Sequence, residues 1–420
     1  MRAIVLVGGK GTRLRPLTLA IPKQILPVVD ATMIERVLGG LASYGVKEAV
    51  LSLGYRPDAF LELFPDGKAA GVEVSYAVEP EPLDTAGAIR FAADHAGIAE
   101  RFVVVNGDVL TDLNLETLVE FHEARGGIGA IALTPVDDPS AFGVVPTDGS
   151  GRVLEFVEKP PRESAPTNLI NAGTYVLEPE VLERVELGRR TSIEREVFPA
   201  LAATGKLFAM ADGEYWLDAG TPAAYLRAHQ DILAGRYGSL TSGGEGASEQ
   251  AAGVWVASGG ARASGGARAS GGARASGGAR AAGGGAPAGR PVIAGEVRPV
   301  SFVGEGCEVE AGAHVSNSVL SRGSKVGAGA VVSSSVLLPG AVVERGATVD
   351  GSIVGTSSVV QEGCSVIGLS VIGCEVVITS GTRLVGARVP DVASASASES
   401  APASASPHRL RDAVPAGDTP

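Results

Sequence analysis

Glycines and basic side chains lie close together near the N-terminus, in the string Gly8-Gly9-Lys10-Gly11-Thr12-Arg13. The string follows an apolar run at residues 3–7, which is typical of a buried strand. Glycines let the backbone pass close to a ligand, and consecutive N–H groups can form a concave anion site. The guanidinium of Arg13 presents a fork of donors that suits phosphate oxygens, and Lys23 adds a second cation ten residues later. The segment therefore predicts a site for a phosphorylated small molecule.

The elements that must position this string are strands and helices that alternate over residues 1–237. Further apolar runs predict strands at 48–53, 72–77, 102–105 and 129–134. Apolar residues at helical spacing predict helices at 33–44 and 115–124. Continuous apolar strands that alternate with helices indicate an α/β domain of Rossmann-like type, with a mostly parallel sheet covered on both faces. Asp108 follows the run 102–105 directly, at a strand end where such sheets bind ligands.

A repeat runs through residues 293–390. Apolar residues are spaced by six within each set of three, and each set begins 17 residues after the last. The sets are Val303, Val309, Val315; Leu320, Val326, Val332; Leu337, Val343, Val349; and Val354, Val360, Val366, with Val371 and Val377 continuing the series. Glycines keep the same step at Gly312, Gly329, Gly346 and Gly363. The period predicts a left-handed parallel β-helix with three short strands per coil, because an irregular sandwich has no such regularity.

Two segments have little apolar surface. Residues 238–292 include four copies of ASGGAR between residues 257 and 280 and predict a flexible linker, with a short strand at 254–256. Residues 391–420 predict a disordered tail.

Composition narrows the classes of function. The 420-residue chain predicts at least two domains, and its net charge of -12 argues against nucleic-acid or anionic-membrane partners. Three cysteines without a CxxC motif indicate neither a disulfide framework nor a zinc site. The N-terminal apolar run is too short for a signal peptide, and no run approaches the length of a membrane span. We therefore expect a cytoplasmic protein.

The N-terminal string continues as Leu14-Arg15-Pro16-Leu17-Thr18 and then Pro22-Lys23. It resembles the GGxGTRLxPLTxxxPK signature of the sugar-1-phosphate nucleotidyltransferases, or nucleotide-sugar pyrophosphorylases. Other motifs of that family follow in order: AVEPEPLDTAGA at 77–88, Asn106-Gly107-Asp108, Phe142-Gly143-Val144-Val145, Glu158-Lys159-Pro160, Asn171-Ala172-Gly173 and Trp216-Leu217-Asp218-Ala219-Gly220-Thr221-Pro222. SIEREVFP at 192–199 is similar to a segment of the mannose-1-phosphate guanylyltransferases, and a β-helix after the catalytic domain is also a family feature.

The resemblance implies transfer of a nucleotidyl group from an NTP to a sugar-1-phosphate, with release of pyrophosphate. In this reaction Arg13, Lys23 and Asp108 would be catalytic, and Asp108 and Asp218 would hold Mg²⁺ through hard oxygen ligands. The implied nucleotide site comprises Gly8, Gly9, Gly11, Thr12, Glu81, Asp84, Thr85, Ala86 and Gly87. The implied sugar-phosphate site comprises Gly143, Glu158, Lys159, Asn171 and Gly173. Taken singly, Asp108 could cap a turn, Asp218 could be the N-cap of a helix near Pro222, and Lys159 could be a solvated charge.

Two residues depart from the common family pattern. Gln24 stands where Pro is usual, and Asp84 stands where Gly is usual. The Asp84 carboxylate could repel phosphate, bind a ribose hydroxyl or accept hydrogen bonds from a guanine-like edge, and the sequence leaves these three roles open.

The SIEREVFP segment and the β-helix favour GTP and mannose-1-phosphate as substrates, giving GDP-mannose. Uridylyl, thymidylyl or adenylyl transfer to glucose-1-phosphate is the nearest alternative, and a non-catalytic regulator that senses a nucleotide sugar is another. A β-helix with acyltransferase activity is less favoured, because His314 is its only histidine and basic residues are few. We expect the β-helix to form a homo-oligomer.

Overall fold

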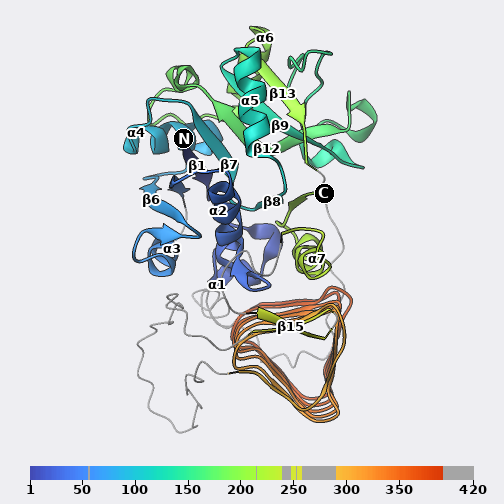
Figure 1. Ribbon diagram of the computed structural model, residues 1–420. Coiled ribbons are helices and arrows are strands. Elements are labelled where there is room, and N and C mark those ends of the chain that lie inside the picture. Colours follow the sequence, from blue (N-terminus) through green and yellow to red (C-terminus); the bar gives the residue numbers. More distant parts are fainter. Residues whose placement is uncertain (55–56, 214, 239–246, 252, 258–289, 391–420) are drawn as a thin grey trace, which may run out of the picture. The chain divides into compact units, whose positions relative to one another are not determined.

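The structure is a computed structural model that describes residues 1–54, 57–213, 215–238, 247–251, 253–257 and 290–390 (Figure 1). The chain forms two compact units. One comprises Met1–Lys10 and Met33–Ala219, and the other comprises Gly11–Thr32 and Gly220–Pro420. The segment 11–32 therefore groups with the C-terminal half of the chain rather than with the predicted domain 1–237. The predicted tail and nearly all of the ASGGAR repeats lie outside the described residues.

The first unit is built on a ten-stranded sheet with the central order β6-β4-β1-β7. These four strands are parallel, as the sequence predicts. They are β1 (Arg2–Leu6), β4 (Glu48–Leu53), β6 (Val72–Val78) and β7 (Phe102–Asn106). The flanking strands make the sheet mixed: β12 (Leu169–Leu177) runs antiparallel to β7 and to β9 (Gly129–Pro135), and the remaining strands are β5 (Lys68–Ala69), β10 (Gly143–Val144), β11 (Val157–Glu158) and β13 (Leu207–Ala211).

Helices cover this sheet because its strands are apolar on both faces. Ala3, Ile4 and Val5 of β1 are all fully buried, although neighbouring residues of a strand point to opposite faces. Ile4 shares a core with Ile89 of α4. The helices of this unit are α2 (Met33–Ser43), α3 (Pro57–Leu63), α4 (Asp84–His95), α5 (Leu115–Arg125) and α6 (Phe198–Ala203), with short turns at Pro139–Ala141, Arg162–Ser164, Pro179–Arg184 and Ile193–Val197.

Strand order places the loops after β1 and β7 at neighbouring strand ends. From β1 the chain reaches β4 on one side and β7 on the other, so the strand order reverses at β1. Ligands of open α/β sheets bind at such a switch point. The N–H of Gly107 donates to the Leu6 carbonyl at 2.9 Å, and a small antiparallel sheet of β8 (Val109–Thr111) and β14 (Trp216–Asp218) follows.

The second unit contains the signature segment, helix α7 and the β-helix. The segment forms η1 (Thr12–Leu14), α1 (Leu17–Ala20), η2 (Lys23–Ile25), β2 (Pro27–Val28) and β3 (Ala31–Thr32). Helix α7 (Pro222–Leu233) is capped by Thr221, whose side chain accepts from the Ala224 N–H at 3.2 Å, so Asp218 is not its N-cap. Tyr225 of α7 donates to the Pro27 carbonyl, and His229 Nδ1 lies 3.1 Å from the Val29 amide nitrogen.

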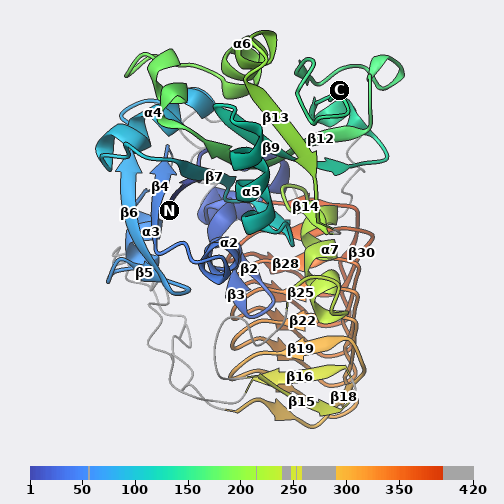
Figure 2. The same ribbon diagram turned by 45° about the horizontal axis from the view of Figure 1, so that its top comes forward.

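The C-terminal repeat forms three parallel sheets that wind into a triangular solenoid, the architecture of the predicted left-handed β-helix (Figures 1 and 2). Each coil contributes one short parallel strand to each sheet, and the first sheet has an additional antiparallel strand at its edge. The first sheet is β15 (Ala247–Ala251), β16 (Val254–Ala257), β19 (Ser301–Val303), β22 (Val319–Leu320), β25 (Val336–Leu337), β28 (Ile353–Val354), β31 (Val371–Ile372) and β34 (Arg388–Val389).

The two other sheets have six strands each. One is β17 (Val292–Ile293), β20 (Glu308–Val309), β23 (Lys325–Val326), β26 (Val342–Val343), β29 (Val359–Val360) and β32 (Val377–Ile378). The other is β18 (Glu296–Val297), β21 (His314–Ser316), β24 (Val331–Ser333), β27 (Thr348–Asp350), β30 (Ser365–Ile367) and β33 (Arg383–Val385).

The predicted inward column is confirmed through Val366 and is wrong beyond it. All twelve residues of the four sets, from Val303 to Val366, are at most 1% exposed. In the next coil Ile372 and Ile378 belong to the core, whereas Val377 is 55% exposed. Ile372 pairs with Val354, 18 residues earlier, because this coil has one additional residue at its first corner.

The N-terminal edge of the β-helix also differs from the prediction. The short strand expected at 254–256 is present as β16, but it pairs in parallel with β19 as a strand of the solenoid. The predicted linker 238–292 thus contains part of the β-helix. An apolar strand that continues the first sheet pairs its backbone with the edge strand and buries its side chains in the core.

Candidate active site

The glycine-rich turn after β1 depends on Gly11. Its φ of 58° lies in the left-handed region, and a Cβ there would lie 2.9 Å from Cγ2 of Thr18. The Thr18 hydroxyl donates to the Gly11 carbonyl at 2.7 Å, which ties the turn to α1. Any larger residue at position 11 would therefore meet both steric overlap and backbone strain.

Arg13 and Lys23 lie on short turns on either side of α1. Arg13 is exposed on η1 next to the buried Leu14, and Lys23 is half-buried at the start of η2. Gln24, which departs from the family pattern, is only 2% exposed. The second unit thus holds both cations on one well-packed segment.

Six predicted residues of the first unit line one pocket of about 150 Å³. They are Asp108, Gly143, Glu158, Lys159, Asn171 and Asp218. Asp108 follows β7, and Asp218 ends β14, whose residues pair with β8 directly after Asp108. The Ala219 N–H donates to the Asp108 carbonyl at 3.2 Å, which fixes the two carboxylate-bearing segments side by side.

Glu158 and Lys159 form an ion pair at the pocket wall. Lys159 Nζ lies 2.9 Å from Glu158 Oε1, and the Lys159 N–H donates to the Phe142 carbonyl at 2.9 Å. Lys159 has a φ of 52°, a conformation that non-glycine residues seldom adopt. Such strain is common where a side chain must be aimed at a ligand. The pair places a cation and a hydrogen-bond acceptor together at one site.

Backbone conformation and packing both require a glycine at position 173. A Cβ at this residue, which has a φ of 78°, would lie 2.4 Å from the side-chain nitrogen of Asn106. Asn171 accepts from the Gly173 N–H at 2.9 Å and donates to the Tyr175 hydroxyl at 2.8 Å. Burial raises the pKa of Tyr175 far above its usual value, so its hydroxyl stays protonated. Gly173 lies behind the pocket, and Asn171 lines it.

Several residues of this pocket were not among the predicted site residues. Trp216 donates from Nε1 to the Ala172 carbonyl at 2.8 Å, and its ring lies edge-on to Phe142 with 5.5 Å between centroids. Asn106 and Glu194 also line the pocket. Glu194 is part of SIEREVFP and Asn106 of the Asn-Gly-Asp motif. Both motifs pointed to these residues, but a motif does not indicate which way its side chains point.

The predicted nucleotide loop has a different environment. Asp84 has a φ of 62°, its Oδ1 accepts from the Thr85 N–H at 2.9 Å, and its Oδ2 lies 3.7 Å from Arg190 Nε. The N–H groups of Ala86 and Gly87 donate to the Thr191 carbonyl at 2.9 and 3.1 Å. Because these amides already have a partner, Ala86 and Gly87 pack α4 against residues 189–191, and direct contact between them and a nucleotide stays a prediction.

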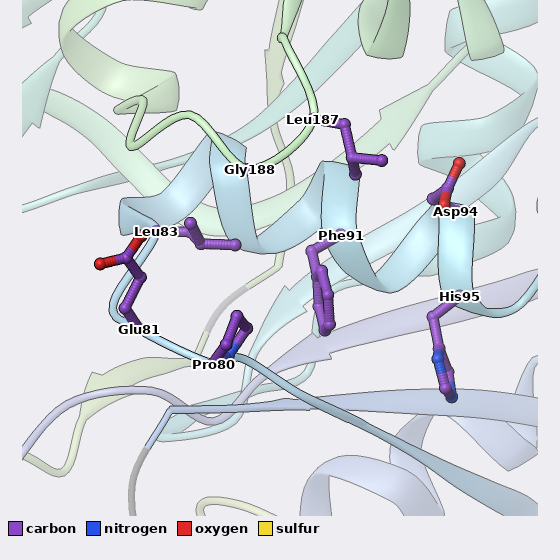
Figure 3. Close-up of a pocket in the computed structure, with 8 residues that line it drawn as sticks. All are labelled: Pro80, Glu81, Leu83, Phe91, Asp94, His95, Leu187 and Gly188. Carbon is purple, nitrogen blue, oxygen red and sulfur yellow. The ribbon is translucent and has the colours of Figure 1, made fainter.

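A second pocket of about 220 Å³ lies beside this loop (Figure 3). Glu81 is its one predicted site residue, and its carboxylate points away from the aromatic rings. Phe91 and His95 project from the same face of α4 with their rings stacked at 6.3 Å. The pocket is mostly apolar, and it contains neither of the predicted metal carboxylates.

The donor set near Asp108 fits a hard divalent cation. Two carboxylates from adjoining segments line the same pocket, and oxygen ligands are those that Mg²⁺ prefers. Within the part of the chain that the structure describes, no three or more His, Cys, Asp or Glu side chains gather as a metal cluster. A cation held here would therefore complete its coordination with water and substrate oxygens, as Mg²⁺ usually does.

Comparison with known families agrees with this arrangement. A family model described as nucleotidyl transferase matches residues 2–235, more than half of the chain. The chain belongs to the nucleotidyl transferase family. A second model, described as the GMPPB C-terminal domain, matches residues 297–402 and covers the β-helix of this nucleotidyl transferase.

Named relatives match just over half of the chain. The mannose-1-phosphate guanylyltransferase of Mycobacterium tuberculosis is 44% identical over 237 residues, which are 56% of this chain and 65% of that protein. The mannose-1-phosphate guanylyltransferase catalytic subunit beta of Dictyostelium discoideum is 42% identical over 228 residues, 54% of this chain and 63% of that protein. The matched region thus spans less than two thirds of the length of these relatives.

A solved structure also matches just over half of the chain. A protein from Bacillus anthracis, assigned as a glucose-1-phosphate thymidylyltransferase and crystallised with sucrose, superposes with a TM-score of 0.50 at 26% identity. The match covers 55% of this nucleotidyl transferase and 94% of that chain. Among the residues that the structure describes, no helix has the length and apolarity needed to cross a membrane.

Proposed function

We propose that this nucleotidyl transferase joins GTP and mannose-1-phosphate to give GDP-mannose and pyrophosphate. The observation that carries the proposal is the pocket in which Asp108, Asp218, Glu158 and Lys159 meet. It combines hard oxygen ligands with a cation and an acceptor, which is what a sugar phosphate and a metal-bound nucleotide require. The 44% identity to a relative named mannose-1-phosphate guanylyltransferase supports mannose and guanine over other pairs.

The sugar phosphate would enter this pocket. Lys159 would neutralise its phosphate. Glu158 would accept hydrogen bonds from the sugar hydroxyls, and Asn171 would accept hydrogen bonds from them or donate to them. Gly143 would let the backbone pass close to the pocket wall, because a Cβ there would lie 2.6 Å from the Phe156 ring and 3.0 Å from Glu158 Oε2. Binding would hold a phosphate oxygen of the sugar ready to attack the α-phosphorus of the nucleotide.

Arg13 and Lys23 would bind the triphosphate and stabilise the charge that builds on departing pyrophosphate. Backbone amides of Gly8, Gly9, Gly11 and Thr12 would add donors to the same phosphates. Asp108 and Asp218 would hold Mg²⁺, which when bound neutralises phosphate charge. The P–O bond to the α-phosphorus forms as the bond to the β-phosphate oxygen breaks, so no covalent enzyme intermediate is needed.

For the rest of the protein we propose supporting roles. The β-helix would mediate self-association. His314 is the only histidine in its described coils, which argues against acyl transfer. His314 Nδ1 lies 2.8 Å from Glu296 in an exposed pair, an arrangement that a surface contact explains. A cytoplasmic location would give the enzyme access to GTP.

Release of pyrophosphate tests the proposed function. The purified protein would be assayed with GTP, UTP, dTTP and ATP, each against mannose-1-phosphate and glucose-1-phosphate, with Mg²⁺ and with EDTA. We expect the GTP and mannose-1-phosphate pair to give the highest kcat/KM and EDTA to abolish turnover. A preference for glucose-1-phosphate would assign the enzyme to the alternative substrates, and no turnover of any pair would support a regulatory protein instead.

A further inference from the structure

The last described coil of the β-helix contacts the backbone of the signature segment. Nη1 of Arg388 donates to the Arg13 carbonyl at 2.8 Å and to the Arg15 carbonyl at 2.9 Å. One side-chain nitrogen therefore bridges two carbonyls from residues that are more than 370 positions away in the chain. All three residues belong to the second compact unit.

The two bridged carbonyls lie in and directly after a short turn. Residues 12–14 form a single 3-10 turn, closed by the Leu14 and Arg15 N–H groups, which donate to Gly11 and Thr12. The carbonyls of Arg13 and Arg15 come at the end of this turn, where carbonyl groups bind donors from outside the turn. Hydrogen bonds from a charged donor are stronger than those from a neutral one, so the Arg388 guanidinium is well suited to fix these carbonyls.

Arg388 itself is held by a rigid platform. It lies in β34, opposite Val371 of β31. The Val371 N–H donates to the Ala387 carbonyl at 2.8 Å, and the Gly373 N–H donates to the Val389 carbonyl at 2.9 Å, so ladder bonds surround Arg388 on both sides. The other end of the signature segment is fixed by α7, through Tyr225 and Pro27. The β-helix and α7 thus hold both ends of the segment that carries Arg13 and Lys23.

We propose that Arg388 is a positioning residue for nucleotide binding, through which the final coil of the β-helix orients the loop that presents Arg13. This inference rests on the proposed function, in which Arg13 binds the triphosphate. In this scheme Arg388 acts through the two carbonyls that its Nη1 binds and not by touching substrate. Its loss would free the loop and lower the fraction of molecules with Arg13 in place for the nucleotide.

The test compares Arg388→Ala with the matched control Arg383→Ala, which removes an exposed arginine from β33 of the same coil. We expect Arg388→Ala to raise the KM for GTP roughly three- to tenfold, the equivalent of about one net hydrogen bond. The KM for mannose-1-phosphate should stay within about twofold, since the residues proposed to bind it lie in the other unit. Arg388→Lys should recover part of the loss, because an ammonium can still donate to one carbonyl.

Hydrogen exchange supplies a readout that does not depend on turnover. In the ligand-free protein, the amides of Arg13, Leu14 and Arg15 should exchange several times faster in Arg388→Ala than in the wild type, and Arg383→Ala should leave them unchanged. Equal exchange and equal KM for GTP in the two alanine variants would overturn the inference. A rise of both KM values together with a lower Tm would also overturn it, because that pattern reports general destabilisation. If wild-type protein turns over no substrate pair, the proposed function fails, and exchange at these three amides still decides whether Arg388 orders the loop.

Discussion

The Thr85 hydroxyl donates to Glu194 Oε2 at 2.6 Å and accepts from the Ile193 N–H at 2.8 Å. It therefore connects the start of α4, in the predicted nucleotide loop, to a carboxylate that lines the pocket of Asp108 and Lys159. Ser192 donates to the same Glu194 oxygen at 2.9 Å. Two hydroxyls thus aim one acidic side chain, and the loop that carries one of them is part of the site even where it makes no contact with a ligand.

Replacing Thr85 by Val should break the link between the predicted nucleotide loop and Glu194. Valine keeps the shape of threonine but removes the hydroxyl, which leaves the Ile193 N–H without its acceptor and Glu194 with one donor fewer. We expect a loss of about 1–2 kcal/mol in the free energy of unfolding and a rise in the KM for the sugar phosphate, because Glu194 is no longer fixed. Urea denaturation and steady-state kinetics measure the two effects. Thr85→Ser keeps the hydroxyl and is the control, and a valine variant that behaves like it would contradict this role.

Much of the fold could be predicted because burial on both sides leaves a simple pattern. Most residues of strands such as β4 and β7 are apolar, and the observed bounds differ from the predicted ones by at most one residue. The inward column of the β-helix was equally legible, since each coil repeats the same step. The antiparallel pairing of β12 with β7 and β9 was not predicted, because it depends on contacts between residues distant in the sequence.

The site was predicted in its residues more than in its geometry. The motifs predicted that Asp108, Glu158, Lys159 and Asp218 belong to one site. All four residues line one pocket. Ala86 and Gly87 share their motif with Thr85, yet their amides are used in packing. A linear motif does not distinguish a residue that faces a ligand from one that supports the loop, because that depends on which side of a turn it occupies.

Asp108→Asn should lower kcat by at least about 100-fold with little change in Tm. The amide has the size of the carboxylate but lacks its charge, so the proposed metal ligand and its electrostatic effect on the phosphates are lost while packing is kept. Asp112→Asn is the matched control: Asp112 Oδ1 accepts from the Tyr215 N–H at 2.9 Å beside the same small sheet, and an amide oxygen can do the same. Near-normal turnover in the Asp108 variant, or equal loss in both, would refute the assignment.

Glu178 should make the stability of the first unit depend on pH. Burial by itself would raise the pKa of this carboxyl, but hydrogen bonds from Arg101 at 2.6 Å and His122 at 2.9 Å outweigh burial and hold the pKa below its ordinary value of 4.5. A group whose pKa is lowered by folding stabilises the protein above its unfolded pKa, and that contribution is lost as pH falls through the folded pKa.

Tm measured from pH 3 to 7 tests this contribution. Glu178→Gln should lower Tm by several degrees at pH 6, from a loss of about 1–3 kcal/mol, and the difference from wild type should shrink as pH falls below 4.5. Glu183→Gln, an exposed residue on the same turn, controls for the substitution itself. A difference between wild type and Glu178→Gln that stays constant over this range would show that charge at Glu178 does not contribute.

Leu369 lies at the corner where the coil of β30 and β31 has its additional residue. Equivalent corners of the other coils are Asn317, Ser334, Gly351 and Gly386, and all of these residues, like Leu369 with its φ of 65°, have positive φ. Leucine in this region costs roughly 1 kcal/mol, whereas asparagine and glycine tolerate it. Leu369 is 38% exposed, so part of its apolar surface faces solvent.

Leu369→Asn should therefore stabilise the β-helix by about 1 kcal/mol and raise its Tm by roughly 2–4 °C. Leu369→Ala is the control, since alanine removes the same exposed apolar surface but keeps the left-handed strain. The asparagine variant should unfold at a higher temperature than both wild type and the alanine variant, while the KM for GTP stays unchanged because Leu369 is not among the residues proposed to bind the nucleotide or to position Arg13. Equal Tm values for the asparagine and alanine variants would mean that the backbone conformation of Leu369 costs nothing measurable and that the additional residue is accommodated without strain.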